Sequence, residues 1–413
     1  MCETNRFAAA AALMLVVAMG FGRFAFTGLY PLMVADHQLS LDGGSYAASA
    51  NYAGYLAGAL LAAVATTIGS RKLCAWATAT TVVMLGLLGV AMPEWLIIAV
   101  RAVAGAASAL AMVAASHWLI HDRRHAHGAA TLFAGVGLGI LVSAEIIAAG
   151  HAAALSSRAI WLTLAAAALM VGAIAIAMQR LLDRAAPAAA EPAALHRSEA
   201  LSSPFGATRL VAVYGLAGFG YIITATYLPL LVRSAMGSID PVHVWAMFGF
   251  GAAPSCFVWH VLHHRCGTRR SLIGNLALQA IGVALPILHS PIAYVASALL
   301  VGGTFMGTVT IVMPAARRLA ATARVNMLAI LTAAYGVGQI VGPLIASNFY
   351  GRTGSFDASL AVAAAALALA AGLCLGKDDP RPSMPGGGTA AGTPAEPVRT
   401  ASPAKLECAA PAE

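Results

Sequence analysis

Long apolar segments, separated by short polar ones, fill the chain from Phe7 to residue 376. A transmembrane helix needs about 20 mainly apolar residues, and these segments show no series of short alternating strands. The pattern therefore predicts an all-α integral membrane protein with twelve transmembrane helices, at 7–34, 45–68, 72–92, 95–119, 126–149, 159–181, 206–233, 241–263, 270–288, 291–316, 325–349 and 355–376.

Two polar stretches divide this pattern. "LDRAAPAAAEPAALHRSEALSSPF" at 182–205 indicates a linker between two sets of six helices. Residues 377–413 are rich in Pro, Gly and Ala and cannot build a core, which predicts a disordered tail. We therefore expect an N-terminal six-helix bundle in 1–181 and a C-terminal six-helix bundle in 206–376.

The two bundles carry an internal repeat. "GFGRFAFTGLYPLMV" at 20–34 aligns without a gap with "GFGYIITATYLPLLV" at 218–232, at an offset of 198 residues. The same offset joins "GSRK" at 69–72 to "GTRR" at 267–270, and Gly105 to Gly303. Separated matches at one offset indicate duplication of a six-helix unit. Repeats of the same topology are related by an axis along the membrane normal, which places a substrate path between them near the midplane.

Composition and charge placement support a membrane protein. Hydrophobic residues make up 60% of the chain and charged residues only 10%, whereas a soluble domain carries about 25% charged residues. With the N-terminus inside, 19 of the 24 Lys and Arg residues fall on the cytoplasmic side, three fall outside, and Arg23 and Arg101 lie within the membrane. This asymmetry predicts that both termini and the linker are cytoplasmic. It also explains the net charge of +8 without a nucleic-acid partner.

The sequence offers little for a metal or cofactor. Its six cysteines form no C-x-x-C pair and no metal-ligand spacing, which predicts no disulfide framework. His117, His121 and His125 recur at helical spacing, an arrangement that can bind zinc. Because no cysteine or carboxylate shares their face, a solvated cytoplasmic loop is the favoured interpretation. We expect no metal site and no cofactor.

Three charged residues inside apolar spans are the candidates for chemistry. At 1.5 Å per residue, Arg23 and Arg101 both lie about 12 Å from the outer edge, and Glu145 lies about 7–8 Å deep. Two arginines against one acid leave a surplus cation, which favours a substrate with an anionic group. The alternative is structural, since an Arg–Glu pair can lock helices together. Glu145 is also the candidate proton carrier.

Polar residues at helical spacing accompany these charges. Thr27 and Tyr30 share the face of Arg23, and Asn51 and Tyr55 share a face of the following helix. Tyr221 and Leu299 replace the two arginines in the second repeat, so that half is neutral. The expected substrate-binding residues are Arg23, Thr27, Tyr30, Asn51, Tyr55, Arg101, Tyr221, Thr224, Tyr335 and Gln339.

Twelve helices in two repeats resemble the major facilitator superfamily. Its motif G-x-x-x-D-[RK]-x-G-[RK]-[RK] occupies the loop after helix 2, where this chain has "TTIGSRK" with Thr66 in place of the acid. The resemblance implies gating loops made by Gly69, Arg71 and Lys72, and in the second repeat by Gly267, Arg269 and Arg270. "GRFAFTGLYPLM", "SANYAGYLAGAL", "AGVGLGI" and "YGVGQIVGPL" are similar to the YbfB/YjiJ-type bacterial subfamily.

This resemblance implies a secondary transporter that moves a small organic solute across the bacterial cytoplasmic membrane by alternating access. No nucleotide-binding sequence is present, so uphill transport would use an ion gradient, with protons as the candidate and uniport left open. A monomer is expected to suffice, although the sequence does not fix the oligomeric state. A membrane sensor or scaffold with a transporter fold is one alternative. An integral-membrane enzyme is less favoured, because the spans offer no nucleophile–base set.

Overall fold

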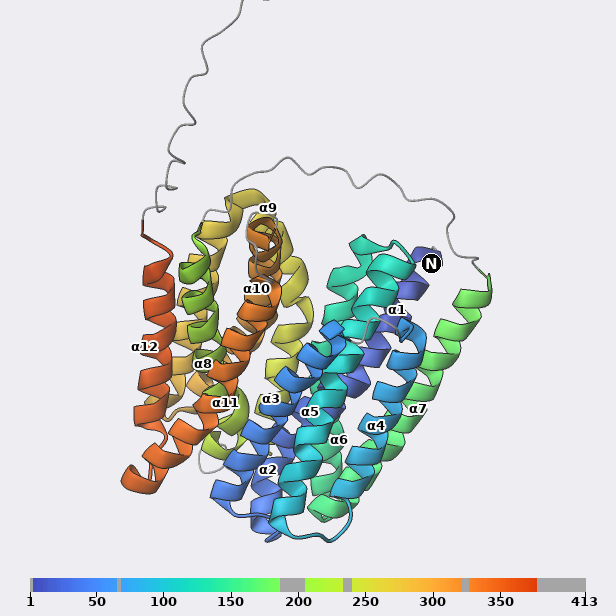
Figure 1. Cartoon of the computed structure of the whole chain (residues 1–413). Coiled ribbons are helices and arrows are strands. Elements are labelled where there is room, and N and C mark those ends of the chain that lie inside the picture. Colours follow the sequence, from blue (N-terminus) through green and yellow to red (C-terminus); the bar gives the residue numbers. More distant parts are fainter. Residues whose placement is uncertain (1–2, 65–67, 186–204, 233–239, 321–326, 377–413) are drawn as a thin grey trace, which may run out of the picture. The chain divides into compact units, whose positions relative to one another are not determined.

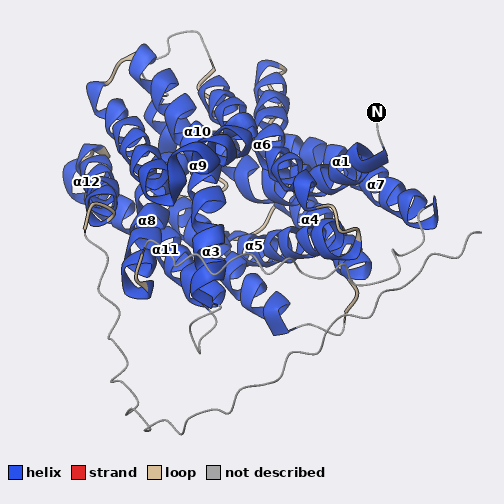
Figure 2. Cartoon of the chain, turned by 90° about the horizontal axis from the view of Figure 1, so that it is seen from above, coloured by secondary structure: helices blue, strands red, loops and turns tan. Residues whose placement is uncertain are grey.

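The structure is a computed structural model of the 413-residue chain, and it describes residues 3–64, 68–185, 205–232, 240–320 and 327–376. Within these ranges the secondary structure is helical and no strand occurs (Figure 2). The described residues belong to one compact unit. The expected tail 377–413 and most of the expected linker lie outside the described residues.

The first half begins with one continuous membrane-crossing helix. It consists of α1 (Glu3–Leu15), the π-helical segment η1 (Val16–Phe24) and α2 (Ala25–Ala35). The remaining elements of this half are α3 (Leu41–Val64), α4 (Ser70–Leu88), α5 (Glu94–His117), η2 (Trp118–Asp122), η3 (Ala126–Gly128), α6 (Ala129–Ala152) and α7 (Ser157–Ala185).

The second half contains six elements among the described residues. They are α8 (Ala207–Val232), α9 (Val242–Ala284), η4 (Leu285–Leu288), α10 (Pro291–Ala320), α11 (Met327–Thr353) and α12 (Asp357–Leu373). Helix α9 contains two helices joined at Gly267, whose φ of 78° and ψ of 167° are non-helical. A side chain would strain this backbone, so the residue type fits the break. The break lies in the predicted loop between the spans 241–263 and 270–288.

The described helices agree with the predicted fold class. Nine of them are long and apolar enough to cross a membrane, and one of these, Val242–Leu288, contains the two helices joined at Gly267. The 24-residue α3 and the shorter apolar α12 fall outside that set. With them, the described chain is consistent with twelve crossings, and the prediction of an all-α membrane protein is confirmed.

Large apolar side chains cover the outside of the bundle. Trp95 on α5, Leu169 and Met170 on α7 and Ile292 on α10 are all exposed. A soluble monomer rarely leaves so many large apolar groups in water, whereas the hydrocarbon of a bilayer accommodates them. The exposed helix faces are therefore lipid-facing surfaces.

The two halves form separate groups of helices that meet along two seams. α8 to α12 lie together, and α1 to α7 lie together (Figures 1 and 2). Between the groups, α3 packs on α11 and α6 packs on α9, and we call these contacts the α3–α11 seam and the α6–α9 seam. We call the end of the bundle that carries the start of α1 the terminal end, and the opposite end the far end (Figure 1).

Candidate functional site

Arg23 is buried in the first helix and surrounded by aromatic rings. Only 4% of the residue is exposed, and its guanidinium carbon lies 4.0 Å from the ring centroid of Tyr55. The rings of Tyr52 and Phe24 lie at 5.1 and 5.2 Å. A cation over the face of an aromatic ring is attracted by the ring quadrupole. These rings therefore stabilise the positive charge without neutralising it.

A local irregularity of the backbone positions this arginine. Arg23 is the eighth residue of the nine-residue π-helical segment η1, and the N–H of Ala25 still bonds to the carbonyl of Gly20, five residues earlier. Stretches of π-helix inside α-helices are rare and frequently occur at functional sites. The wider turn changes the directions in which the side chains of η1 point relative to α2.

Arg23 is linked to the second half through an amide. Its Nη2 donates to Oε1 of Gln339 at 3.1 Å, and Nε2 of Gln339 donates to the hydroxyl of Tyr221. Tyr221 is the residue that corresponds to Arg23 in the repeat, at the offset of 198. Gln339 on α11 therefore bridges two equivalent positions of the two halves.

A direct contact between equivalent residues lies one turn further along. The hydroxyl of Thr27 donates to the carbonyl of Ala225 at 2.8 Å, and the two residues are 198 apart. A residue that touches its own equivalent lies at the approximate two-fold axis relating the repeats. Arg23 therefore lies beside this axis, where a substrate path between parallel repeats is expected.

Arg101 is equally buried but has different partners. It is 2% exposed, and its Nη1 and Nη2 donate to the carbonyls of Gly22 and Arg23, each at 3.0 Å. Its guanidinium carbon lies 4.4 Å from the ring centroid of Phe26. The side chain of Asn51 donates to the carbonyl of Arg101 at 2.9 Å. Arg101 thus holds the π-helical backbone that presents Arg23, and its contact with substrate stays a prediction.

The two arginines have no acidic partner among the described residues, where no carboxylate lies within ion-pair distance of either guanidinium. The Nε atoms of Arg23 and Arg101 are buried and make no hydrogen bond. A buried cation is costly unless it is paired. The described site therefore has a surplus of positive charge together with unused donor capacity.

The second half presents rings and neutral polar groups to this site. Tyr221 stacks on Tyr335 and Phe305, with centroids 5.8 and 5.1 Å apart, and Tyr335 stacks on Tyr214 at 4.4 Å. Thr224 is fully buried, and its hydroxyl has no hydrogen-bond partner in the described part of the chain. At this site the first half contributes two arginines, whereas the residues of the second half named here are neutral.

Two further predicted residues have local partners. The hydroxyl of Tyr30 donates to the carbonyl of Leu41 at 2.6 Å, towards the far end of the first helix. The hydroxyl of Tyr55 donates to the sulfur of Met112 at 2.8 Å, which leaves its ring against Arg23. The structure therefore brings Tyr55 to Arg23, whereas the phenol of Tyr30 is engaged elsewhere.

Glu145 does not join the arginines. Half of its side chain is exposed, and its Oε1 lies 3.1 Å from Nδ1 of His243, at the start of α9 in the other half. No ion pair links it to Arg23 or Arg101 among the described residues. The Arg–Glu pair considered from the sequence is therefore not formed in this structure, and the role of Glu145 in proton coupling stays a prediction.

The first expected gating loop contacts an acid that sequence reasoning missed. Gly69 precedes α4, and Nη1 of Arg71 lies 3.5 Å from Oδ2 of Asp183. Asp183 is buried, also pairs with Arg123, and accepts a hydrogen bond from Nε1 of Trp118 at 3.1 Å. Thr66, which replaces the acid of the motif, lies outside the described residues. Asp183 on α7 supplies a carboxylate to this loop.

The second expected gating loop contacts the end of the last helix. Nε of Arg269 donates to the carbonyl of Cys374 at 2.8 Å, and the guanidinium also donates to the carbonyl of Gly376. Lys72 and Arg270, the last basic residues of the two loops, are exposed. The contacts of Arg269 tie the break at Gly267 to the last turn of the bundle.

Several ring residues of the site were also missed. Phe24, Tyr52 and Phe305 lie around Arg23 and Tyr221, but aromatic residues in an apolar span carry no polar signal. The sequence did indicate that Asp183 could belong to the last helix of the first half, because the apolar pattern of α7 continues through Leu181 and Leu182 into the expected linker. Among the described residues, no group of three His, Cys, Asp or Glu side chains is arranged to hold a metal.

Comparison with known proteins identifies the family. No curated protein matches the chain. The family model described as "Uncharacterised MFS-type transporter YbfB" matches residues 15–375, a range that begins in the first helix and ends after the last. The fold agrees, since the described residues form apolar helices in two groups. The chain therefore belongs to the YbfB-type family of major facilitator superfamily transporters.

Proposed function

We propose that this membrane transporter moves a small organic solute with an anionic group, and that it binds this group at Arg23. The observation that supports this is the buried guanidinium of Arg23, which has no carboxylate partner among the described residues and lies beside the two-fold axis. A carboxylate or similar anion would supply the missing charge. The planar donor fork of arginine suits such a group.

The neighbours of Arg23 suggest how the rest of the solute is held. Gln339 holds one guanidinium nitrogen and can offer its amide to a polar group. The rings of Tyr55 and Tyr221 belong to opposite halves. A solute between them would contact both halves at once, which is the condition for coupling binding to their relative movement. The apolar or aromatic part of the solute would face these rings.

The contacts between the halves suggest which state of the cycle this is. Hydrogen bonds between Ser49 and Ile340, and between Tyr52 and Thr226, join the halves towards the far end. If the termini are cytoplasmic, as the charge asymmetry predicts, the far end is the outer side. The structure then corresponds to a state in which the outer entrance is closed.

Binding to purified protein tests the proposal. We expect a panel of organic anions, cations and neutral compounds to raise the melting temperature of the wild type only with certain anions. Arg23→Ala should weaken that binding by about 2–5 kcal/mol if the contact is desolvated and charge-paired. Arg23→Lys should weaken it less, because lysine keeps the charge but loses the fork. Arg158→Ala, at an exposed arginine in the first turn of α7, is the matched control and should bind normally.

Stability without ligand separates this role from a structural one. A binding residue predicts reduced affinity with nearly unchanged ligand-free melting, because removal of an intramembrane charge lowers the insertion cost. A large loss of ligand-free stability with unchanged affinity would instead show that Arg23 serves only to hold helices together.

Proton coupling belongs to the same proposal. Glu145 is the acid that we propose as the proton carrier, with a proton gradient as the driving force and uniport as the alternative. Glu145→Gln should abolish accumulation driven by a pH gradient while exchange of solute across the membrane continues. A mutant that still accumulates solute with the wild-type pH profile would remove Glu145 from the coupling mechanism.

A further inference from the structure

The polar contacts of the α3–α11 seam provide a reference for the second seam. At the far end, the hydroxyl of Ser347 on α11 donates to Oδ1 of Asp42 on α3. The hydroxyl of Tyr227 lies 2.6 Å from Oγ of Ser45 and 3.0 Å from the carbonyl oxygen of Pro343. Apart from Asp42, every group in these contacts is a hydroxyl or a carbonyl.

The α6–α9 seam has its contacts at corresponding positions, but they are titratable. Nδ1 of His151, at the end of α6, lies 2.5 Å from Oδ2 of Asp240, and Nδ1 of His243 lies 3.1 Å from Oε1 of Glu145. Asp240 is held in place, because its other oxygen accepts the N–H of Val242 at 2.9 Å. The repeat offset of 198 carries Asp42 onto Asp240, Ser45 onto His243, and Glu145 onto Pro343.

The two seams therefore have polar contacts at equivalent positions but form them with different chemical groups. In each seam an aspartate before or at the start of one helix bonds to the far end of a helix from the other half. One turn further along, Tyr227 bridges Ser45 and Pro343 in the first seam. The equivalent positions in the second seam, His243 and Glu145, contact each other directly. Only the second seam uses histidines as partners of these carboxylates. Duplication alone does not explain two His–carboxylate pairs in the same seam.

We infer that the α6–α9 seam is a proton-binding latch that joins the two halves at the far end. Protons bind to His151 and His243 while Asp240 and Glu145 face them from the opposite half. The inference deepens the proposed function, since it assigns a proton-sensitive step to the alternating-access cycle proposed above. It concerns the closure of the seam and does not depend on the identity of the solute.

The charge of the histidines determines how pH shifts the balance between the joined and the separated halves. Histidine is the side chain whose charge normally changes between about pH 5 and 8. With the seam joined, each histidine lies within ion-pair distance of a carboxylate of the opposite half, and a charged imidazolium attracts that carboxylate more strongly than a neutral ring does. Separation of the halves removes both contacts. Acidic pH on the far side therefore favours the joined state, and basic pH favours separation.

Among the described residues, no other ion pair reaches the four residues of the latch. The remaining acidic and basic groups near this end, on the elements packed against α6 and α9, are Asp36, His37, Arg158, His289 and Asp357. Asp36 accepts hydrogen bonds from Ser157, and His289 is paired with Asp357. Tyrosines there stay neutral, because the phenol titrates near pH 10. Arg233 lies outside the described residues.

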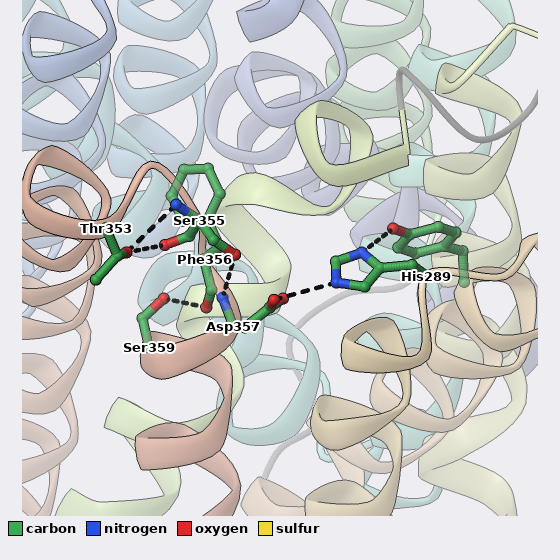
Figure 3. Close-up of polar contacts among 7 residues, drawn as sticks. His289, Thr353, Ser355, Phe356, Asp357 and Ser359 are labelled. Carbon is green, nitrogen blue, oxygen red and sulfur yellow. Dashed lines mark hydrogen bonds and ion pairs between the residues drawn. The ribbon is translucent and has the colours of Figure 1, made fainter.

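A matched control pair exists within one half. Nε2 of His289, which follows η4, lies 3.1 Å from Oδ2 of Asp357 at the start of α12 (Figure 3). Nδ1 of His289 lies 3.3 Å from the hydroxyl oxygen of Tyr294. This pair has the same chemistry and the same separation as His243 and Glu145, and it is similarly exposed. Both of its residues belong to the second half. It therefore contains the same ionisable groups but does not join the halves.

The test measures the separation of the halves at two pH values. Spin labels at Ala153 and Ile292, exposed residues at the far ends of the two halves, report the distance by double electron–electron resonance. The full-length chain, with its own cysteines replaced by alanine, is placed in lipid nanodiscs without solute. We expect the ratio of joined to separated molecules to rise between pH 8.5 and pH 5.5 by up to about fivefold for each pair, since half-exposed ion pairs are weak.

The variants decide whether the histidine pairs cause the change. The double variant His151→Asn/His243→Asn should show the same ratio at both pH values, while Asp357→Asn should respond as the parent does. The single variants His243→Asn and Glu145→Gln should each retain a smaller response, and they apply the same test if the double variant is not recovered. An unchanged ratio in the parent, or a variant of the seam that responds like the parent, would overturn the latch. Solute binding at Arg23 is not measured here, so the two proposals fail separately.

Discussion

Arg23 and Arg101 show how one residue type serves two purposes in one site. Both are buried, but the two terminal nitrogens of Arg101 donate hydrogen bonds to the carbonyls of Gly22 and Arg23. Arg23 uses one nitrogen on Gln339 and is otherwise surrounded by rings. A guanidinium bonded to backbone cannot also grip a solute with the same nitrogens. We therefore expect Arg101 to act on binding mainly through the position of Arg23.

This division of roles predicts different effects of the same substitution. Arg101→Leu removes two hydrogen bonds from a charged donor to the buried carbonyls of Gly22 and Arg23, and each such bond contributes about 1.5–3 kcal/mol. The ligand-free melting temperature should therefore fall, and it should fall further than in Arg23→Leu. Thermal melting of both purified variants in the same detergent makes the comparison. Equal melting temperatures would mean that Arg101 does not support the π-helical segment.

For single residues, the sequence predicted which residues meet at the site better than it predicted where each side chain points. It singled out Arg23, Tyr55, Tyr221 and Gln339, and these four meet in the structure. Depth along the helix also suggested that Glu145 lies with the arginines, but depth does not give the face on which a side chain lies. Helix α6 is apolar on nearly every side, so periodicity could not show that Glu145 points to α9.

Among the elements, glycine determines how closely α3 and α5 pack. A side chain at Gly54 would collide with the backbone carbonyl of Ala102, and one at Gly105 would collide with the carbonyl of Asn51. Small residues at such crossings let helix backbones approach closely in membranes. This contact fixes α3 against α5, and so fixes Tyr55 and Arg101 relative to each other.

A methyl group should therefore be tolerated at one glycine and not at another. Gly54→Ala forces α3 and α5 apart, and overpacking of this kind typically costs about 1–3 kcal/mol. Gly274, in the second helix of α9, has no atom near the position of a new methyl group. Gly274→Ala is the control and should leave the melting temperature unchanged or slightly higher, because alanine favours helix. A Gly54→Ala protein as stable as the control would show that the crossing can relax.

The elements themselves were largely predictable, because a bilayer demands long apolar helices. The loop expected near Gly267 appears as a break inside α9, where the positive φ needs glycine. The π-helical segment was not predictable, since apolar periodicity in a buried helix does not distinguish a π turn from an α turn. The end of α7 was also placed four residues too early, and Asp183 was assigned to the linker for that reason.

For the whole molecule, the orientation in the membrane is the property on which the other proposals depend. The basic residues predict that the terminal end is cytoplasmic. Reporter fusions at Ala190 in the linker and Ala395 in the tail should both give cytoplasmic signals. A periplasmic signal from either fusion would reverse the topology, and the far-end latch would then respond to cytoplasmic pH.

The bond between Thr27 and Ala225 has a consequence for the history of the molecule. In a homodimer with two-fold symmetry, a residue on the axis meets its own copy, and every substitution there occurs twice. A six-helix ancestor that paired with itself would have placed two arginines, or two tyrosines, face to face at the positions now held by Arg23 and Tyr221. A chain that carries both copies is free of that constraint, because each copy can change alone and a single cation can lie beside the axis.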